Sequence, residues 1–169
     1  MEFRSLPFYV GVASALALAA SAAERPWAPP IAKGPIMLHA ERLFWRPALP
    51  GLPEGCRIAS LEGNPAEPDM FTIRVTLPAE ARLAPHWHAQ GYRVTIISGS
   101  VFVGAGDGIV ESYAEELPVG AFWASPAGFH HYLFTKQQAV VQITAMGPWD
   151  ITYVDQKDDP RTSTAGAVK

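Results

Sequence analysis

The sequence predicts an all-β domain, either a sandwich or a closed barrel built from short strands. The clearest strand is the run 70–77, Met-Phe-Thr-Ile-Arg-Val-Thr-Leu, in which apolar and polar residues alternate. A period of two is typical of a strand with one buried face. Other short apolar runs follow, separated by turns that use many of the 16 prolines and 14 glycines. No later segment has the apolar period of an amphipathic helix, which favours the all-β class.

Length and composition indicate one globular domain. The chain has 169 residues, of which 49% are apolar and 17% are charged, so it is too apolar for a disordered protein. Its 13 basic and 16 acidic residues give a net charge of −3. Without a basic excess to neutralise phosphates, nucleic acid is not an expected partner. The single cysteine, Cys56, excludes an internal disulfide and a cysteine-based zinc site, and we expect a buried, inert thiol.

Residues 1–23 have the pattern of a secretory signal peptide. No charged residue occurs between Arg4 and Glu24, the middle is rich in Leu, Val and Ala, and small residues follow at 20–23. A permanent membrane anchor is the alternative, but the run is short, rich in alanine and interrupted by Pro7. The sequence therefore predicts a periplasmic or secreted protein that has no membrane attachment once the signal is removed.

The mature chain divides into an arm, a domain and a tail. The arm, 24–35, contains four prolines, the domain spans 36–155, and the polar residues 156–169 predict a flexible tail. Within the domain, turn residues separate apolar runs that we interpret as strands. These runs are 36–45, 56–61, 70–77, 92–98, 101–103, 109–113, 121–124, 129–134 and 140–145.

Histidines are the residues on which a chemical site could be built. His86 and His88 are two positions apart, so in a strand their side chains leave the same face. Their spacing allows two imidazoles to converge on one ion. In the later run 129–134, alternation places His131 on one face and His130 on the other.

Two segments around these histidines resemble the motifs of the cupin family. The first is Pro85-His86-Trp87-His88, followed by Tyr92 and then by Gly99; the second runs from Gly120 through Pro126 and Gly128 to His131. The resemblance implies a double-stranded β-helix, the cupin jelly-roll barrel, as found in small single-domain cupins. It also implies that His86, His88 and His131 ligate a metal inside the barrel and that a homodimer forms.

The sequence departs from the family pattern at two positions. Tyr92 stands where the first motif has a glutamate ligand, and Thr135 stands where the second motif sometimes ends in asparagine. Tyr92 is either a functional phenol (ligand, hydrogen-bond donor or acid) or an aromatic plug that fills the space of the glutamate. Gln90 is an alternative oxygen ligand, and Arg93 and His130 are expected on the outside.

The resemblance implies one divalent transition metal, which could be Zn, Fe, Ni, Mn or Cu. Three neutral imidazoles leave its +2 charge undiminished, which favours anionic ligands. We therefore expect an oxygenase, isomerase or lyase that acts on a small anionic or enolisable molecule, with Tyr92 as a catalytic residue. A noncatalytic binding module and a metal-free, sugar-binding or epimerase-like cupin are the alternatives.

Overall fold

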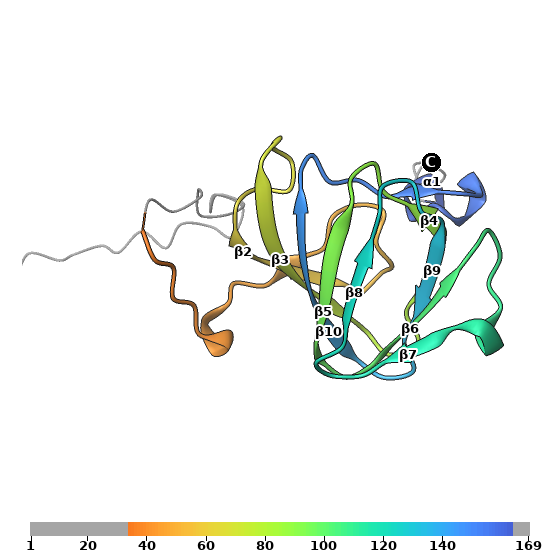
Figure 1. The fold of residues 1–169 in the computed structure, drawn as a ribbon, viewed down its shortest axis with the longest axis horizontal. Coiled ribbons are helices and arrows are strands. Elements are labelled where there is room, and N and C mark those ends of the chain that lie inside the picture. The colour runs from red at the N-terminus through yellow and green to blue at the C-terminus, as the bar shows by residue number, and fades with distance from the viewer. Residues whose placement is uncertain (1–33, 164–169) are drawn as a thin grey trace, which may run out of the picture.

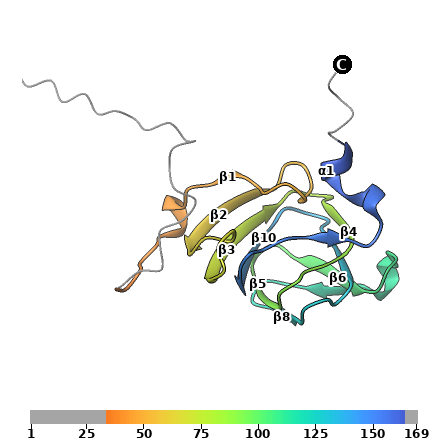
Figure 2. The same ribbon diagram turned by 90° about the horizontal axis from the view of Figure 1, so that it is seen from above.

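The computed structural model describes residues 34–163, and in this part of the chain two antiparallel sheets face each other (Figure 1). One sheet has the strand order β1-β2-β3-β10-β5-β8, and the other has the order β11-β4-β9-β6-β7. Seen from above, strands of both sheets surround a common interior (Figure 2). The predicted all-β class and the jelly-roll arrangement are confirmed. The predicted signal peptide 1–23 and all but the last two residues of the predicted arm 24–35 lie outside the described residues.

The strands are short, and three 3-10 helices and one α-helical turn connect or follow them within residues 34–163. The strands of the six-stranded sheet are β1 (Arg46–Pro47), β2 (Arg57–Glu62), β3 (Met70–Leu77), β5 (Tyr92–Ser98), β8 (Phe122–Ser125) and β10 (Ala139–Met146). Those of the five-stranded sheet are β4 (Arg82–Trp87), β6 (Val101–Ala105), β7 (Glu115–Leu117), β9 (His131–Phe134) and β11 (Thr152–Tyr153). The helices are η1 (Ala40–Arg42), η2 (Glu111–Tyr113), η3 (Gln156–Asp158) and α1 (Pro160–Ser163).

The inward faces of the strands form the core. In β3, every second residue from Phe71 to Leu77 is buried, as the alternation of the sequence predicted. β10 pairs with β3 along its whole length, from Met70 opposite Met146 to Leu77 opposite Ala139. The same alternation continues in β5 and β10, and apolar side chains of the five-stranded sheet, such as Leu83 and Val101, belong to the same core.

The prediction of a strand over 36–45 is wrong. Residues 40–42 form η1, and the pairing with β2 is limited to the two residues of β1. The apolar side chains before η1 are not part of the core, since Met37 is 83% exposed and Leu38 is also exposed. A run of apolar residues indicates a strand only when a neighbouring strand can pair with it, and the sequence does not show that partner.

The prediction of a strand over 109–113 is also wrong. Residues 111–113 form η2 instead. β6 pairs with β9 on one side and with β7, whose residues follow this segment, on the other. The hydroxyl group of the buried Tyr132 accepts a hydrogen bond from the Val110 amide and donates one to the Val110 carbonyl. Both backbone groups of Val110 are thereby taken by a side chain and cannot join a strand ladder.

The beginning of the predicted flexible tail is folded in the structure. Residues 156–158 form η3 and residues 160–163 form α1. The Arg161 guanidinium contacts Asp150 and Asp159 and donates a hydrogen bond to the Ile151 carbonyl. The contacts with Asp150 and Ile151 attach α1 to the segment that precedes β11. Polar composition alone does not reveal such contacts. None of the helices among residues 34–163 has the length and apolar character to cross a bilayer.

Gly104 in β6 gives a first testable prediction. A β-carbon added at Gly104 would collide with the ring of Tyr132, the residue opposite it in β9. Tyr132 is fully buried and its hydroxyl is held by Val110, so the ring cannot move aside. We expect Gly104→Ala to lower the free energy of unfolding by about 1–3 kcal/mol, measured by urea denaturation. Gly108→Ala is the matched control, because nothing lies near its added carbon, and a loss of similar size there would contradict the explanation.

Candidate metal centre

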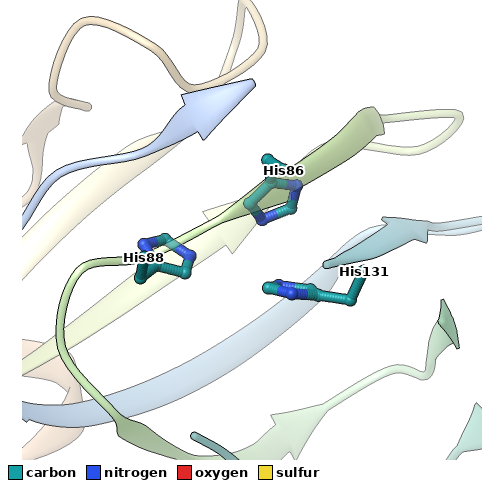
Figure 3. A group of neighbouring side chains, drawn as sticks. All are labelled: His86, His88 and His131. Carbon is teal, nitrogen blue, oxygen red and sulfur yellow. The ribbon is translucent and has the colours of Figure 1, made fainter. Parts of the chain in front are cut away.

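Strand pairing in the five-stranded sheet brings three histidines together. His86 in β4 and His131 in β9 are direct cross-strand partners, and their ring centroids are 4.2 Å apart. His88 follows one residue after β4 ends and returns to the same side of the strand. One ring nitrogen from each histidine lies within 4.8 Å of the other two. Figure 3 shows the three rings turned toward a common point inside the barrel.

Backbone carbonyl groups fix the tautomer of each ring. In all three histidines Nδ1 lies at hydrogen-bond distance from a carbonyl oxygen, which only accepts. The pairs are His86 with Ala84 at 2.7 Å, His88 with Asp150 at 2.6 Å and His131 with Phe129 at 2.9 Å. Nδ1 therefore carries the hydrogen atom and Nε2 keeps its lone pair, which is the usual arrangement of a metal-binding histidine.

Burial keeps the three rings neutral. His86 is 1% exposed, His88 is 5% and His131 is 0%. Desolvation lowers the pKa of His86 to about 3, and the neighbouring His131 contributes in the same direction. Burial also lowers the pKa of His88 and the pKa of His131 to about 4. Only neutral imidazole ligates a metal. At pH 7 the three rings are neutral, so they could hold a divalent ion.

Tyr92 contributes a hydroxyl group from the opposite sheet. It begins β5, and its oxygen lies 2.7 Å from Nε2 of His131. Since His131 carries its hydrogen on Nδ1, the Tyr92 hydroxyl donates this bond. Burial raises the pKa of Tyr92 far above its ordinary value of 10, although a hydrogen bond with Ser125, its cross-strand partner in β8, acts in the opposite direction. Tyr92 is therefore a protonated donor directed at the triad.

Two tryptophans that the motifs did not indicate form the wall of the site. The indole of Trp149 stacks on His88 with ring centroids 4.1 Å apart, and Trp123 meets His131 edge-on at 4.9 Å. Trp149 lies in the loop after β10, distant in sequence from both histidine motifs. The carbonyl group of the next residue, Asp150, was also not foreseen, because a backbone acceptor has no side-chain signature. Only the folded chain brings these groups to His88.

Other residues singled out in the sequence lie away from the triad. His130 is partly exposed and pairs with Asp107 at 2.5 Å, which agrees with its expected outward position. Arg93 and Gln90 are exposed, so Gln90 does not supply the oxygen ligand considered above. Cys56 is buried in the apolar core, where desolvation raises the pKa of its thiol to about 11 and leaves it unreactive.

Comparisons with known proteins support the fold that the geometry defines, a cupin barrel with a buried histidine triad. Neither a family model nor a curated protein matches the sequence. Among solved structures, the polyketide cyclase RemF from Streptomyces resistomycificus matches with a TM-score of 0.61 at 18% identity, over 78% of this chain and 93% of that chain.

Two further structures are described as cupins. A sugar phosphate isomerase of the cupin superfamily from Silicibacter pomeroyi has a TM-score of 0.55 at 17% identity, over 71% of this chain and 82% of that chain. An RmlC-like cupin from Shewanella frigidimarina has a TM-score of 0.51 at 16% identity, over 64% of this chain and 87% of that chain. The chain therefore has the cupin fold, as its two histidine motifs predicted.

Proposed function

We propose that this protein is a metal-dependent enzyme, an oxygenase, isomerase or lyase that acts on a small molecule with an anionic or enolisable oxygen. In this proposal His86, His88 and His131 hold one divalent transition metal, which is Zn, Fe, Ni, Mn or Cu. The observation that carries the proposal is the preset triad, in which one nitrogen of each buried ring lies within 4.8 Å of the others while a carbonyl group holds each Nδ1 hydrogen.

The charge of the site selects the substrate group. A bound divalent ion would act as a Lewis acid that polarises a substrate oxygen. The three rings are neutral, and the cluster contains no carboxylate that would offset the charge of the ion. An anionic or enolisable oxygen is therefore the group that this set of ligands favours most.

Tyr92 is the proposed hydrogen-bond donor to the substrate oxygen. Its hydroxyl group now donates to Nε2 of His131, the nitrogen that has to be free for ligation. Once that lone pair is engaged in ligation, the Tyr92 hydroxyl needs another acceptor, and the substrate oxygen is the group that can provide one. Trp123 and Trp149 meet the ring of Tyr92 edge-on, with ring centroids 5.3 Å and 5.0 Å away, and they surround the Tyr92 ring with apolar surface, in which a hydrogen bond from its hydroxyl is stronger than in water.

One observation also supports the metal-free alternative. The bond from Tyr92 to His131 satisfies the buried nitrogen without any ion, as a binding module that lacks metal would require. Elemental analysis of the full chain, purified without chelators, separates these possibilities. About one ion per chain supports the metal site, whereas far less than one, with no uptake from added Zn²⁺ or Fe²⁺, supports the metal-free alternative.

Tyr92 variants provide the second testable prediction. Tyr92→Phe removes the hydrogen bond that competes for His131, so we expect about fivefold tighter Zn²⁺ binding, the value of a single hydrogen bond. Tyr92→Glu restores the residue of the family motif, and a carboxylate ligand should tighten binding about tenfold or more. Competition with a chromogenic chelator measures both affinities. Tyr113→Glu adds the same charge at an exposed tyrosine and should change nothing. No tightening in Tyr92→Glu would identify Tyr92 as an aromatic plug.

Turnover separates an enzyme from a noncatalytic metal-binding module. Metal-loaded protein is incubated with a panel of enolisable and anionic compounds while oxygen consumption and product formation are followed. Activity that is absent from His86→Ala supports the enzyme, and its absence from the loaded wild-type protein across the panel supports the binding module.

The proposal includes location and partners. Removal of residues 1–23 and export to the periplasm or the medium are supported by the charge-free, alanine-rich run before Glu24. The mature protein would then bind neither membrane nor nucleic acid, take a small-molecule ligand and form a homodimer. Mass spectrometry of the exported protein tests the cleavage, and light scattering after gel filtration tests the dimer.

A further inference from the structure

A cavity lies inside the barrel next to the histidines. Its volume is about 320 Å³, and His86, His88 and Tyr92 contribute to its wall. This volume is within the range of small-molecule binding sites. Most of the remaining wall consists of aliphatic side chains from eight strands of both sheets, such as Val75 of β3 and Val103 of β6. Two of the three histidines, His86 and His88, therefore face an apolar chamber.

The wall offers few polar groups beyond His86, His88 and Tyr92. Among residues 34–163, no Ser, Thr, Asn, Gln, Glu or Lys side chain lines the cavity. The two charged residues in its wall, Asp150 and Arg161, pair with each other at 3.0 Å, and Arg161 also pairs with Asp159 at 2.8 Å. Because the Arg161 charge is already compensated, it does not mark a phosphate or carboxylate site.

This distribution of groups excludes polyhydroxylated ligands. A sugar or sugar phosphate in the cavity would bury several hydroxyl groups against aliphatic carbon, and each unpaired group would cost binding free energy. An apolar ring system would instead gain by leaving water. Two indoles, Trp123 and Trp149, also line the cavity and offer aromatic contacts to a flat ring.

We infer that the ligand is a mostly apolar, ring-containing molecule that carries one acidic oxygen, a phenol or enol, at the end facing the triad. The apolar body follows from the cavity wall. The position of the acidic oxygen rests on the proposed metal function, because only the triad and Tyr92 give that oxygen a partner. The inference narrows the proposed substrate class, since it requires a single polar end and disfavours sugars and small polyanions.

Isothermal titration calorimetry of the full chain, with Zn²⁺ and after chelator treatment, tests the inference. The probes are 1-naphthol, which has one acidic hydroxyl, its methyl ether 1-methoxynaphthalene, and glucose 6-phosphate. We expect both naphthyl compounds to bind and glucose 6-phosphate not to bind. In the Zn²⁺-loaded protein 1-naphthol should bind about tenfold tighter than its ether, and this difference should become smaller without the metal.

Variants locate the binding. Val103→Phe narrows the cavity and should weaken both naphthyl compounds about tenfold or more. Leu117 of the edge strand β7 also lines the cavity, so Leu117→Trp should narrow the cavity and weaken binding in the same way. This variant replaces Val103→Phe in the experiment if Val103→Phe does not fold. Val119→Phe makes an equal change at an exposed residue outside the cavity and should leave binding unchanged.

The outcomes separate this inference from the proposed function. Binding of glucose 6-phosphate in preference to 1-naphthol overturns the ligand class even when the chain holds one zinc. Naphthyl binding that the narrowing variants do not weaken also overturns it. Equal binding of 1-naphthol and its ether to the zinc-loaded protein overturns the acidic oxygen. If the chain holds no metal, the proposed function fails, and the apolar class is then decided by comparing the same probes on metal-free protein.

Discussion

Replacement of His86 by alanine is expected to lower the affinity for Zn²⁺ more than about a hundredfold, because loss of a direct ligand should exceed the 10–100-fold cost of losing an outer-shell partner. His86 lies at the centre of the cluster, with His131 opposite it in the sheet and His88 two residues further along the chain. Its removal leaves two ligands and an enlarged cavity. Competition titration against a chromogenic chelator measures the change.

His130→Ala is the matched control for this experiment. His130 adjoins His131 in sequence but faces outward and pairs with Asp107, so its loss should leave zinc affinity unchanged. Circular dichroism of both variants shows whether they keep the β fold. Undiminished zinc binding by a folded His86→Ala protein would contradict the proposed site, and an equal loss in both variants would point to zinc binding on the surface.

Strands with strict alternation were predictable from the sequence. The predicted bounds of 70–77 and 92–98 equal those of β3 and β5, because both strands lie inside the six-stranded sheet with one face on the core. The segment 109–113 was not predictable, because the backbone groups of Val110 bond to the hydroxyl of Tyr132, a residue of β9. Such a bond depends on tertiary structure and leaves no periodic signal.

In the candidate site, too, some features were predictable from the sequence and others depend on the folded structure. His86, His88 and His131 could be selected from their spacing and their resemblance to two motifs. The sequence did not reveal that three backbone carbonyls fix the rings, or that Trp149 stacks on His88. It left the role of Tyr92 open, because the contact from its hydroxyl to His131 joins opposite sheets. Residue types can therefore be predicted locally, whereas their hydrogen-bond partners depend on the register of the barrel.

Acid should destabilise the metal-free protein strongly, because the three buried rings of the triad resist protonation in the folded chain. Burial lowers the pKa of His86 to about 3 and the pKa of both His88 and His131 to about 4, against about 6.5 in the unfolded chain. Below about pH 6.5 the unfolded chain therefore binds protons that the folded chain does not, and stability falls with decreasing pH. The three rings together should lower the free energy of unfolding by on the order of 5 kcal/mol between about pH 7.5 and pH 5.

Urea denaturation of chelator-treated protein across this pH range measures the effect. His131→Phe should reduce the slope of stability against pH by about a third, because one of three titrating rings is gone. A flat stability profile in the metal-free protein would mean that the folded triad takes up protons as readily as the unfolded chain. That result would contradict the lowering of the three pKa values by burial, because rings with ordinary pKa values take up protons below about pH 6.5 whether the chain is folded or not.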